Sequence, residues 1–266
     1  MIPNSENFSG THFIAHGNGS PVILIHGIAA SLHDWIHLVP ALTEAGYRSY
    51  ALDLLGHGDS SKPVEPGQYH FQYLYTQLTE WIATLQLMQP PILIGHSLGG
   101  FLCLNYALDH PDCVQRLVLA APLYQYNQIS PWLRIINRRP AIIARSVRLA
   151  PVWLVHTLAG WEINPRMTFS SPIRHQKAVD YKRASPHFLH IPRTVPDLTT
   201  QLPHLTTKTL VVWGENDLTL KPASFPRLVK ILPNARGYAI PHCGHQPHLG
   251  MYVLFNRLVL DFFNEI

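Results

Sequence analysis

The chain has 266 residues, of which 47% are apolar and 14% are charged, so it can bury a large core. Its longest apolar stretches, such as "PVILIHG", are far shorter than the ~20 residues that cross a bilayer, and the N-terminus lacks a basic region followed by an apolar run. We therefore expect a globular cytoplasmic protein. The three cysteines, Cys103, Cys113 and Cys243, show no spaced framework, which argues against structural disulfides.

The formal charge of +4 is unevenly distributed along the chain. Residues 122–200 contain 11 lysine and arginine residues against three acidic residues, whereas the rest of the chain is mildly acidic. A basic segment can bind nucleic acid, but no zinc knuckle, aromatic stacking platform or lysine-rich tail accompanies this one. We therefore expect no nucleic-acid partner.

Short aliphatic runs, each ending near Gly or Asp, alternate with helical patterns along the chain. The runs cover residues 21–27, 47–56, 90–95, 114–122, 208–214 and 235–240. The helical patterns cover residues 32–46, 73–87 and 101–110, and a last one covers 251–266. Because runs of this kind are typical of buried parallel strands, the alternation predicts an α/β fold with a mostly parallel sheet and helices on both faces.

Residues 122–207 interrupt this alternation. They contain no clear strand, several prolines, and helical patterns over 130–139 and 140–158. We interpret this segment as a helical insertion into a core made of residues 1–121 and 208–266.

The sequence "ILIGHSLGG", residues 92–100, is the most specific motif. Gly95, Ser97 and Gly99 form Gly-x-Ser-x-Gly directly after a predicted strand and before a predicted helix. A nucleophile on a strained strand-to-helix turn stands clear of the sheet, and glycines two residues away on each side leave room for that backbone. The motif therefore indicates a nucleophilic serine, and the alternative is a Gly-rich turn with a capping serine.

On these residues the sequence resembles the α/β-hydrolase family over essentially its whole length, most weakly in residues 122–207. The resemblance implies a Ser, Asp/Glu, His triad in that chain order, an oxyanion hole, and a helical cap (lid) inserted after the sixth strand. Residues 122–207 would be that cap. "LIHGIAAS" resembles the family's His-Gly loop, which implies that the backbone N–H groups of Ile28 and Leu98 form the oxyanion hole.

The acid and the base of the implied triad lie after the last two predicted strands. "VVWGENDLTL" supplies Asp217, with Glu215 as its neighbouring competitor. "IPHCGHQPHLG" supplies His245 in the family's Gly-His position. The family often has a glutamate five residues later, where this chain has Gly250, so any support for the loop must come from elsewhere.

The same histidine-rich loop has a second interpretation as a metal site. His242, His245 and His248 could converge on a metal ion if they lay on one helix, but Pro241, Gly244 and Pro247 make a continuous helix unfavourable. We therefore expect no metal, and we interpret His242 and His248 as loop or helix-entry residues.

The resemblance and the intact triad predict acyl transfer to water through an acyl-serine, without a cofactor, on a largely apolar ester or thioester. The cap would choose the substrate, and Trp132, Trp153 and Trp161 are candidates to line its pocket, although packing within the cap is the default role of such residues. Two alternatives remain open. One is a cofactor-free haloperoxidase or perhydrolase, or a carbon–carbon bond hydrolase, with the same triad; the other is a hydrolase-fold receptor for a small apolar ligand.

The cap is also basic. At about 100° per residue, its four arginines at 134, 138, 145 and 148 would share one narrow arc of a helix, although Pro140 interrupts the pattern. Such a face could bind an anionic membrane surface as a peripheral contact, and the alternative is a solvated arginine face.

Overall fold

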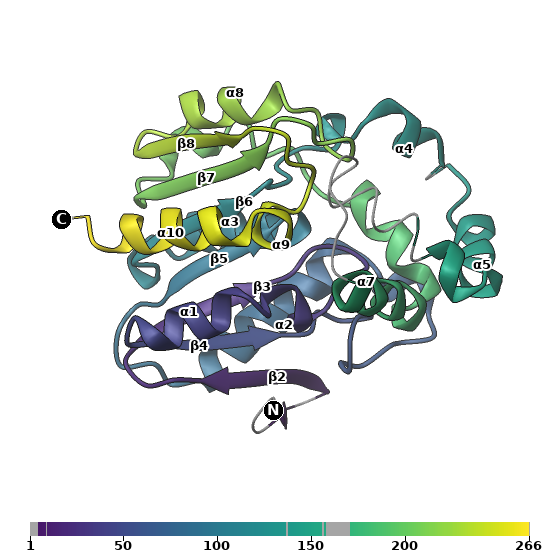
Figure 1. Cartoon of the computed structure of the whole chain (residues 1–266), viewed down its shortest axis with the longest axis horizontal. Coiled ribbons are helices and arrows are strands. Elements are labelled where there is room, and N and C mark those ends of the chain that lie inside the picture. Colours follow the sequence, from purple (N-terminus) through teal and green to yellow (C-terminus); the bar gives the residue numbers. More distant parts are fainter. Residues whose placement is uncertain (1–4, 9, 137, 156, 158–170, 266) are drawn as a thin grey trace.

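The computed structural model describes residues 5–8, 10–136, 138–155, 157 and 171–265 (Figure 1). Eight strands form a single sheet in the order β1-β2-β4-β3-β5-β6-β7-β8. Their bounds are Ser5–Phe8, Thr11–His16, Ser20–Ile25, Tyr47–Leu52, Ile92–His96, Arg116–Ala120, Thr209–Gly214 and Ala235–Ile240 for β1 to β8. The pairs β1/β2 and β2/β4 are antiparallel, and every other neighbouring pair is parallel.

The structure confirms the six strands that the aliphatic runs predict, and it adds β1 and β2 at one edge. Strands β3, β5 and β7 are almost wholly buried. Side chains on such a strand meet a hydrophobic layer on each face, which is why these segments read as continuous apolar runs. In β3, Ile23 and Ile25 face one hydrophobic cluster, and Val22 and Leu24 face the other.

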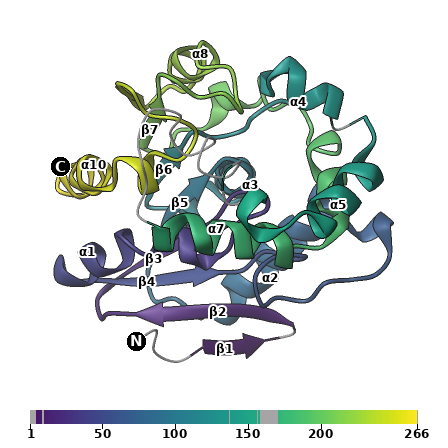
Figure 2. The ribbon, with the colours of Figure 1, turned by 45° about the vertical axis from the view of Figure 1, so that its right-hand side comes forward.

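Helices cover both faces of the sheet (Figures 1 and 2). Helices α1 (Leu38–Glu44) and α10 (Tyr252–Phe263) cover one face, and α2 (Phe71–Thr84), α3 (Leu98–Asp109) and α8 (Ser224–Ile231) cover the other. Shorter elements are the 3-10 helices η1 (Leu32–Trp35), η2 (Pro66–Gln68) and η3 (Pro111–Cys113), and helix α9 (Pro247–Gly250). The single helix expected over residues 32–46 is therefore divided into η1 and α1.

The regular elements that the structure describes between β6 and β7 are helices, joined by turns and irregular segments, and Ile129 forms an isolated bridge with Leu220 beyond β7. The helices are η4 (Tyr126–Gln128), α4 (Pro131–Ile136), α5 (Pro140–Leu149), α7 (Ser171–Arg183), η5 (Pro186–Arg193) and η6 (Leu202–His204). Figure 2 shows α4, α5 and α7 on the side of the sheet where its parallel strands end. We call residues 122–207 the helical insertion. The division into a core domain and a cap domain stays a prediction.

The four arginines of the insertion do not share one helix. Helix α4 ends at Ile136 and α5 begins at Pro140, so Arg134 and Arg145 belong to different helices and Arg138 lies between them. Pro140, which cannot donate a backbone hydrogen bond, starts a new helix and divides the arc, as its place in the sequence indicated. Contact with an anionic membrane stays a prediction. None of the described helices is long and apolar enough to cross a membrane.

We expect Leu93→Ala to lower the free energy of unfolding by about 2–5 kcal/mol, because Leu93 is fully buried in the central strand β5 and its truncation leaves a cavity. Met88→Ala is the matched control, since Met88 is 99% exposed and its loss should change stability by less than about 0.5 kcal/mol. Urea unfolding measures both. Equal effects of the two substitutions would contradict the packing described above.

Candidate active site

Ser97 lies on the turn between β5 and α3, in a backbone conformation that side-chain-bearing residues seldom adopt. Its φ is 51° and its ψ is −111°, and a conformation of this kind typically costs about 1–3 kcal/mol. Helix α3 starts at the next residue, and its first turn packs closely against the end of β3. A Cβ at Gly99 would lie only 2.1 Å from the carbonyl oxygen of Ile25. The glycine of the motif is therefore required by close backbone approach, as the sequence predicted.

The loop after β3 lies directly beside Ser97. A Cβ at Gly27 would lie 2.7 Å from Nδ1 of His96 and 3.2 Å from the Cβ of Ser97, so a side chain there would displace His96. Ile28 follows Gly27, and Leu98 is the first residue of α3. Within the described residues, neither the Ile28 N–H nor the Leu98 N–H donates a hydrogen bond to another protein atom. Both donors are available to a ligand, and a helix N-terminus favours negative charge.

Asp217 and His245 form a buried pair. The Nδ1 atom of His245 lies 2.7 Å from Oδ2 of Asp217. The other oxygen of Asp217 accepts hydrogen bonds from the backbone N–H groups of Thr219, at 2.8 Å, and Leu220, at 2.9 Å. Glu215, the competitor, is exposed. The carboxylate of Asp217 is thus held in one orientation, and it fixes the His245 ring with Nδ1 as the donor.

Backbone hydrogen bonds hold the loops that carry Asp217, His245 and Ser97 together. The N–H of Asn216 donates to the carbonyl of Cys243 at 2.9 Å. The Nε2 atom of His96, the residue before Ser97, lies 3.1 Å from the carbonyl oxygen of His245. Because a carbonyl can only accept, this nitrogen of His96 carries the proton. Loops from three strand ends, far apart in sequence, therefore lie together.

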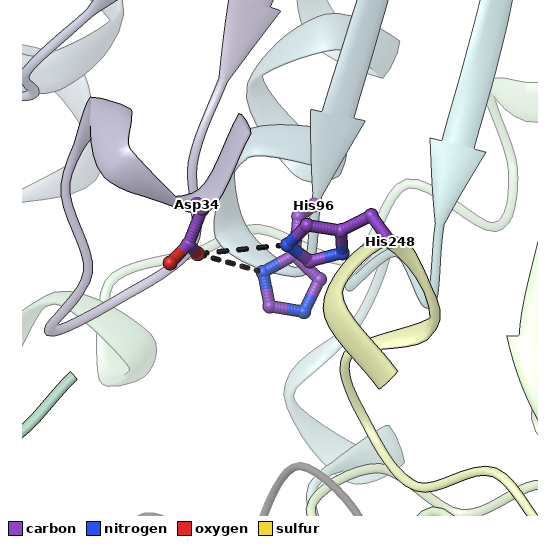
Figure 3. A group of neighbouring side chains, drawn as sticks. All are labelled: Asp34, His96 and His248. Carbon is purple, nitrogen blue, oxygen red and sulfur yellow. Dashed lines mark ion pairs between the residues drawn. The ribbon is translucent and has the colours of Figure 1, made fainter. Parts of the chain in front are cut away.

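The histidines of the loop 240–250 do not form the metal site considered from the sequence. His242 is exposed and has a φ of 57°, which ends any helical path toward His245. His248 is fully buried at the start of the short helix α9. It lies near Asp34 and His96 (Figure 3). His248 lies at the entry to a helix, as expected. Its burial beside a carboxylate was not expected from the sequence.

Asp34 is the carboxylate of this second group, which the sequence analysis missed. It lies on η1, and its Oδ2 atom is 3.7 Å from Nε2 of His248 and 3.9 Å from Nδ1 of His96 (Figure 3). Its Oδ1 atom is 3.0 Å from Nζ of Lys177, which comes from helix α7 of the insertion. No local sequence pattern predicts the pair of Lys177 and Asp34, because 143 residues separate them.

The protonation states of this group follow from burial and charge. Burial alone raises the pKa of Asp34, but Lys177 and His248 outweigh it and hold the pKa below its usual range. Burial lowers the pKa of His96 and of His248, since an imidazolium is poorly solvated there. Asp34 and Lys177 are thus charged and the two imidazoles are neutral at neutral pH. Asp34 also places a buried carboxylate beside the loop of His245. The family often has a glutamate at the position of Gly250 in this loop.

The three tryptophans proposed for the substrate pocket have different surroundings. Trp132 is half exposed, and its Nε1 donates to the carbonyl of Leu218 at 3.1 Å, next to Asp217. Trp153 is 69% exposed, and nothing in the described structure brings it to Ser97. Trp161 lies outside the described residues. Only Trp132 is thus seen close to the catalytic loops.

An open cavity of about 610 Å³ lies between α4 and the end of η5. Three arginines line it together with apolar and aromatic side chains, and the lining residues are Tyr126, Pro131, Arg134, Ile135, Arg138 and Arg193. No carboxylate is among these lining residues. Such a cavity suits a ligand that combines an anionic group with an apolar body.

Comparison with known proteins places the chain among α/β hydrolases. Residues 20–250 match the family model described as "alpha/beta hydrolase fold". Bifunctional epoxide hydrolase 2 of Rattus norvegicus is 37% identical over 131 residues, which are 48% of this chain and 23% of that protein. The chain thus spans about a quarter of that relative. The 2-hydroxy-6-oxo-6-(2'-aminophenyl)hexa-2,4-dienoic acid hydrolase of Metapseudomonas resinovorans is 29% identical over 88% of this chain and 81% of its own.

Among solved structures, the bromoperoxidase from Bacillus anthracis superposes with a TM-score of 0.83 at 25% identity. The match covers 96% of this chain and 95% of the bromoperoxidase. The three proteins carry names of different reactions, so the fold alone does not select one of them.

Asp180, on the same helix as Lys177, generates a prediction about pH and stability. Burial, together with the nearby charge of Asp34, raises its pKa to about 6, although Lys177 opposes the shift. The folded state therefore holds this proton more tightly than the unfolded state does, and the contribution of Asp180 to stability falls as pH rises from about 4 to beyond 6.

We expect Asp180→Asn to gain stability over the wild type by up to about 3 kcal/mol at pH 8, and to lose this advantage at about pH 4. The amide can still accept the hydrogen bond that Gln176 donates to Oδ1. Urea unfolding at both pH values measures the difference. The control is Asp112→Asn, which changes an exposed carboxylate and should show no such trend. A pH-independent effect at Asp180 would contradict the raised pKa.

Proposed function

Since the chain belongs to the α/β-hydrolase fold family, we propose that it is a serine hydrolase that cleaves a carboxylic ester or thioester of a largely apolar substrate. The single observation that carries the proposal is the buried His245–Asp217 pair, 2.7 Å apart, on loops joined to the strained turn of Ser97. A base that is oriented by a carboxylate and can reach a serine hydroxyl is the arrangement that activates a serine.

The proposed reaction uses only groups of this chain and needs no cofactor. Nδ1 of His245 donates to Asp217, so Nε2 has the lone pair that takes the proton of Ser97 as its oxygen attacks the carbonyl carbon. The N–H groups of Ile28 and Leu98 would stabilise the oxyanion. The carbon–oxygen or carbon–sulfur bond then breaks, and His245 returns the proton to the leaving alcohol or thiol. Water, deprotonated by His245, hydrolyses the acyl-serine in the second half.

Ser97 argues against epoxide opening, although an epoxide hydrolase is among the relatives. Epoxide hydrolases of this fold attack with a carboxylate, and the residue at the turn here is a serine. A receptor that binds a ligand without turnover would keep the fold but would not require Asp217 to be held by two backbone donors. Sustained turnover of an aryl ester distinguishes a hydrolase from such a receptor.

We expect Ser97→Ala to lower kcat/KM for an aryl ester by roughly 10⁴-fold to 10⁶-fold, because it removes the nucleophile. The fold should persist, since only one hydroxyl is lost. A serine-reactive phosphonate should label the wild type at Ser97 and leave the variant unlabelled. The control is His242→Ala, which alters an exposed histidine of the same loop and should keep most of the activity. More than a tenth of the wild-type activity in Ser97→Ala would exclude this mechanism.

A second candidate is hydrolysis of a carbon–carbon bond in a substrate that carries a carboxylate. Two observations favour it: the relative from Metapseudomonas resinovorans is named for a dienoic acid, and the 610 Å³ cavity presents three arginines. An arginine binds a carboxylate through two parallel hydrogen bonds, so this cavity could select an acidic substrate. Its rim is tied to the catalytic loop, since Ser130 N–H donates to the carbonyl of Thr219 at 2.9 Å.

If the cavity binds the acidic part of the substrate, Arg134→Gln with Arg138→Gln should raise KM for an ester or diketone that carries a carboxylate by about 10-fold to 100-fold. The KM for a neutral ester of the same size should change little. Arg145→Gln is the matched control, because this arginine is exposed on α5 and does not line the cavity. Equal changes for neutral and acidic substrates would exclude the cavity from substrate selection.

A further inference from the structure

One contact between the helical insertion and the core is a buried ion pair of Lys177 with Asp34, and Figure 3 shows Asp34 beside His96 and His248. We propose that Lys177 and Asp34 are positioning residues: their ion pair forms when the insertion packs on the core, and it aligns His245 for catalysis through His96 and His248. The inference rests on the proposed function, because it assumes that His245 is the base.

Both members of the pair are buried away from water. Lys177 and Asp34 are each 2% exposed, and their side chains meet at 3.0 Å. A buried charge without a counterion costs much more free energy than a buried ion pair. Loss of either member should therefore strongly destabilise the other. Because Lys177 comes from α7 and Asp34 from η1, movement of α7 away from the core would leave a buried carboxylate without its counterion.

A short path leads from Asp34 to the proposed base. Asp34 Oδ2 faces His248, three residues beyond His245, and His96, one residue before Ser97. His96 donates from Nε2 to the carbonyl oxygen of His245, so its Nδ1 carries a lone pair and cannot donate to Asp34. His248 can turn a donor toward Asp34, at 3.7 Å. The His245 backbone is thus linked to Asp34 through the hydrogen bond from His96, and His248, three residues further along the chain, adjoins the same carboxylate.

Burial is the main reason why the pKa values of these imidazoles are low, and the charge of Lys177 contributes to the same effect. The ammonium disfavours a proton on His96 and on His248, and burial, the larger cause, acts in the same direction. Without Lys177, the nearest compensation for Asp34 is a proton on His248 or on Nδ1 of His96. A charged imidazole would draw toward Asp34 and loosen the hydrogen bond from His96 to His245. Closure of the insertion is therefore coupled to the geometry of the base.

The other charged and titratable groups around the pair are known. Asp180 and the ring of Tyr181, 5.9 Å from Nζ, lie on the same helix as Lys177. His26, from the loop after β3, also feels the charges of Asp34 and Lys177. His245 itself is paired with Asp217. None of these groups replaces Lys177 at Asp34 Oδ1, which lies 3.0 Å from Nζ.

The atoms of Asp34, His96 and His248 lie within 4.8 Å of one another, so a metal ion is the competing explanation of this group. A divalent ion there would share Asp34 with the ammonium of Lys177, and the two cations would repel each other. The ion pair already supplies the positive charge that the carboxylate needs. The geometry therefore favours an ion pair that joins the insertion to the core, which we call the Lys177–Asp34 latch, over a metal site.

The test compares Lys177→Met, Asp34→Asn and the double variant by the pH dependence of kcat/KM for a short neutral aryl ester. Loss of the cation should move the acid limb to higher pH by about 0.5–1 unit, because the proposed base then binds its proton more tightly. Loss of the anion should move the limb to lower pH by a similar amount. The double variant should return close to the wild type. A packing defect alone would reduce the amount of active enzyme without moving the limb in opposite directions.

We further expect Lys177→Met to lower kcat at neutral pH at least 10-fold with little change in KM, and the double variant to recover most of that loss. Lys182→Met is the matched control, since Lys182 lies on the same helix but donates to the carbonyl of Ala150. It should leave the acid limb unchanged. If Lys177→Met does not fold, the proposal is still tested by the acid limbs of Asp34→Asn and of the double variant. The first should shift to lower pH, and the second should lie close to that of the wild type.

Three results would overturn the inference. They are acid limbs that coincide in all variants, a shift in Lys182→Met equal to that in Lys177→Met, or one equivalent of a transition metal bound by the purified wild type. The proposed function fails separately, through activity that survives in Ser97→Ala. An inactive Ser97→Ala with coincident acid limbs would leave the serine hydrolase standing and remove only the latch.

Discussion

The backbone at Ser97 keeps its unfavourable dihedral angles because the segments around it are packed backbone to backbone. Gly99 meets the carbonyl of Ile25, and Gly27 meets the Cβ of Ser97, so neither the helix nor the loop can relax without opening the centre of the sheet. This constraint sets the direction of the serine side chain. Beside it lie the N–H groups of Ile28 and Leu98, which donate to no protein atom in the described part of the chain. The remaining parts of the candidate site are arranged around a turn that the core holds rigidly.

Charge inside the protein imposes the second constraint. Asp217 and His245 are satisfied within the loops of the core, whereas Asp34 depends on a lysine from the helical insertion. A buried carboxylate needs a counterion, so the insertion contributes to the electrostatics of the site as well as to its walls. Arg134, Arg138 and Arg193 line the cavity between α4 and η5. The same segment thus supplies a buried cation to the core and cations to this cavity.

The sequence predicted the sheet well and its edges poorly. Continuous apolar runs marked the buried parallel strands, because both of their faces are covered, but the antiparallel strands β1, at the edge, and β2, beside it, have no such run. Helix α8 was likewise not predicted, and the pattern over residues 32–46 was assigned to one helix where the structure has two elements. Each of these errors lies where the periodic pattern of apolar residues is short. Pro140 divides the arginine arc, because a proline starts a new helix there.

The candidate site divides in the same way. Short motifs placed Ser97, Asp217 and His245 at strand ends, and the structure brings His245 and Asp217 within 2.7 Å of each other. The catalytic roles of the three residues stay predictions. The sequence also determined the glycines, since close backbone approach excludes any side chain there. Only the tertiary structure decided that His248 is buried, that it shares a carboxylate with His96, and that Lys177 neutralises Asp34 from 143 residues away. A motif records what the local backbone requires, whereas a buried charge is satisfied by whichever residue the fold brings near it, and no local spacing encodes that partner.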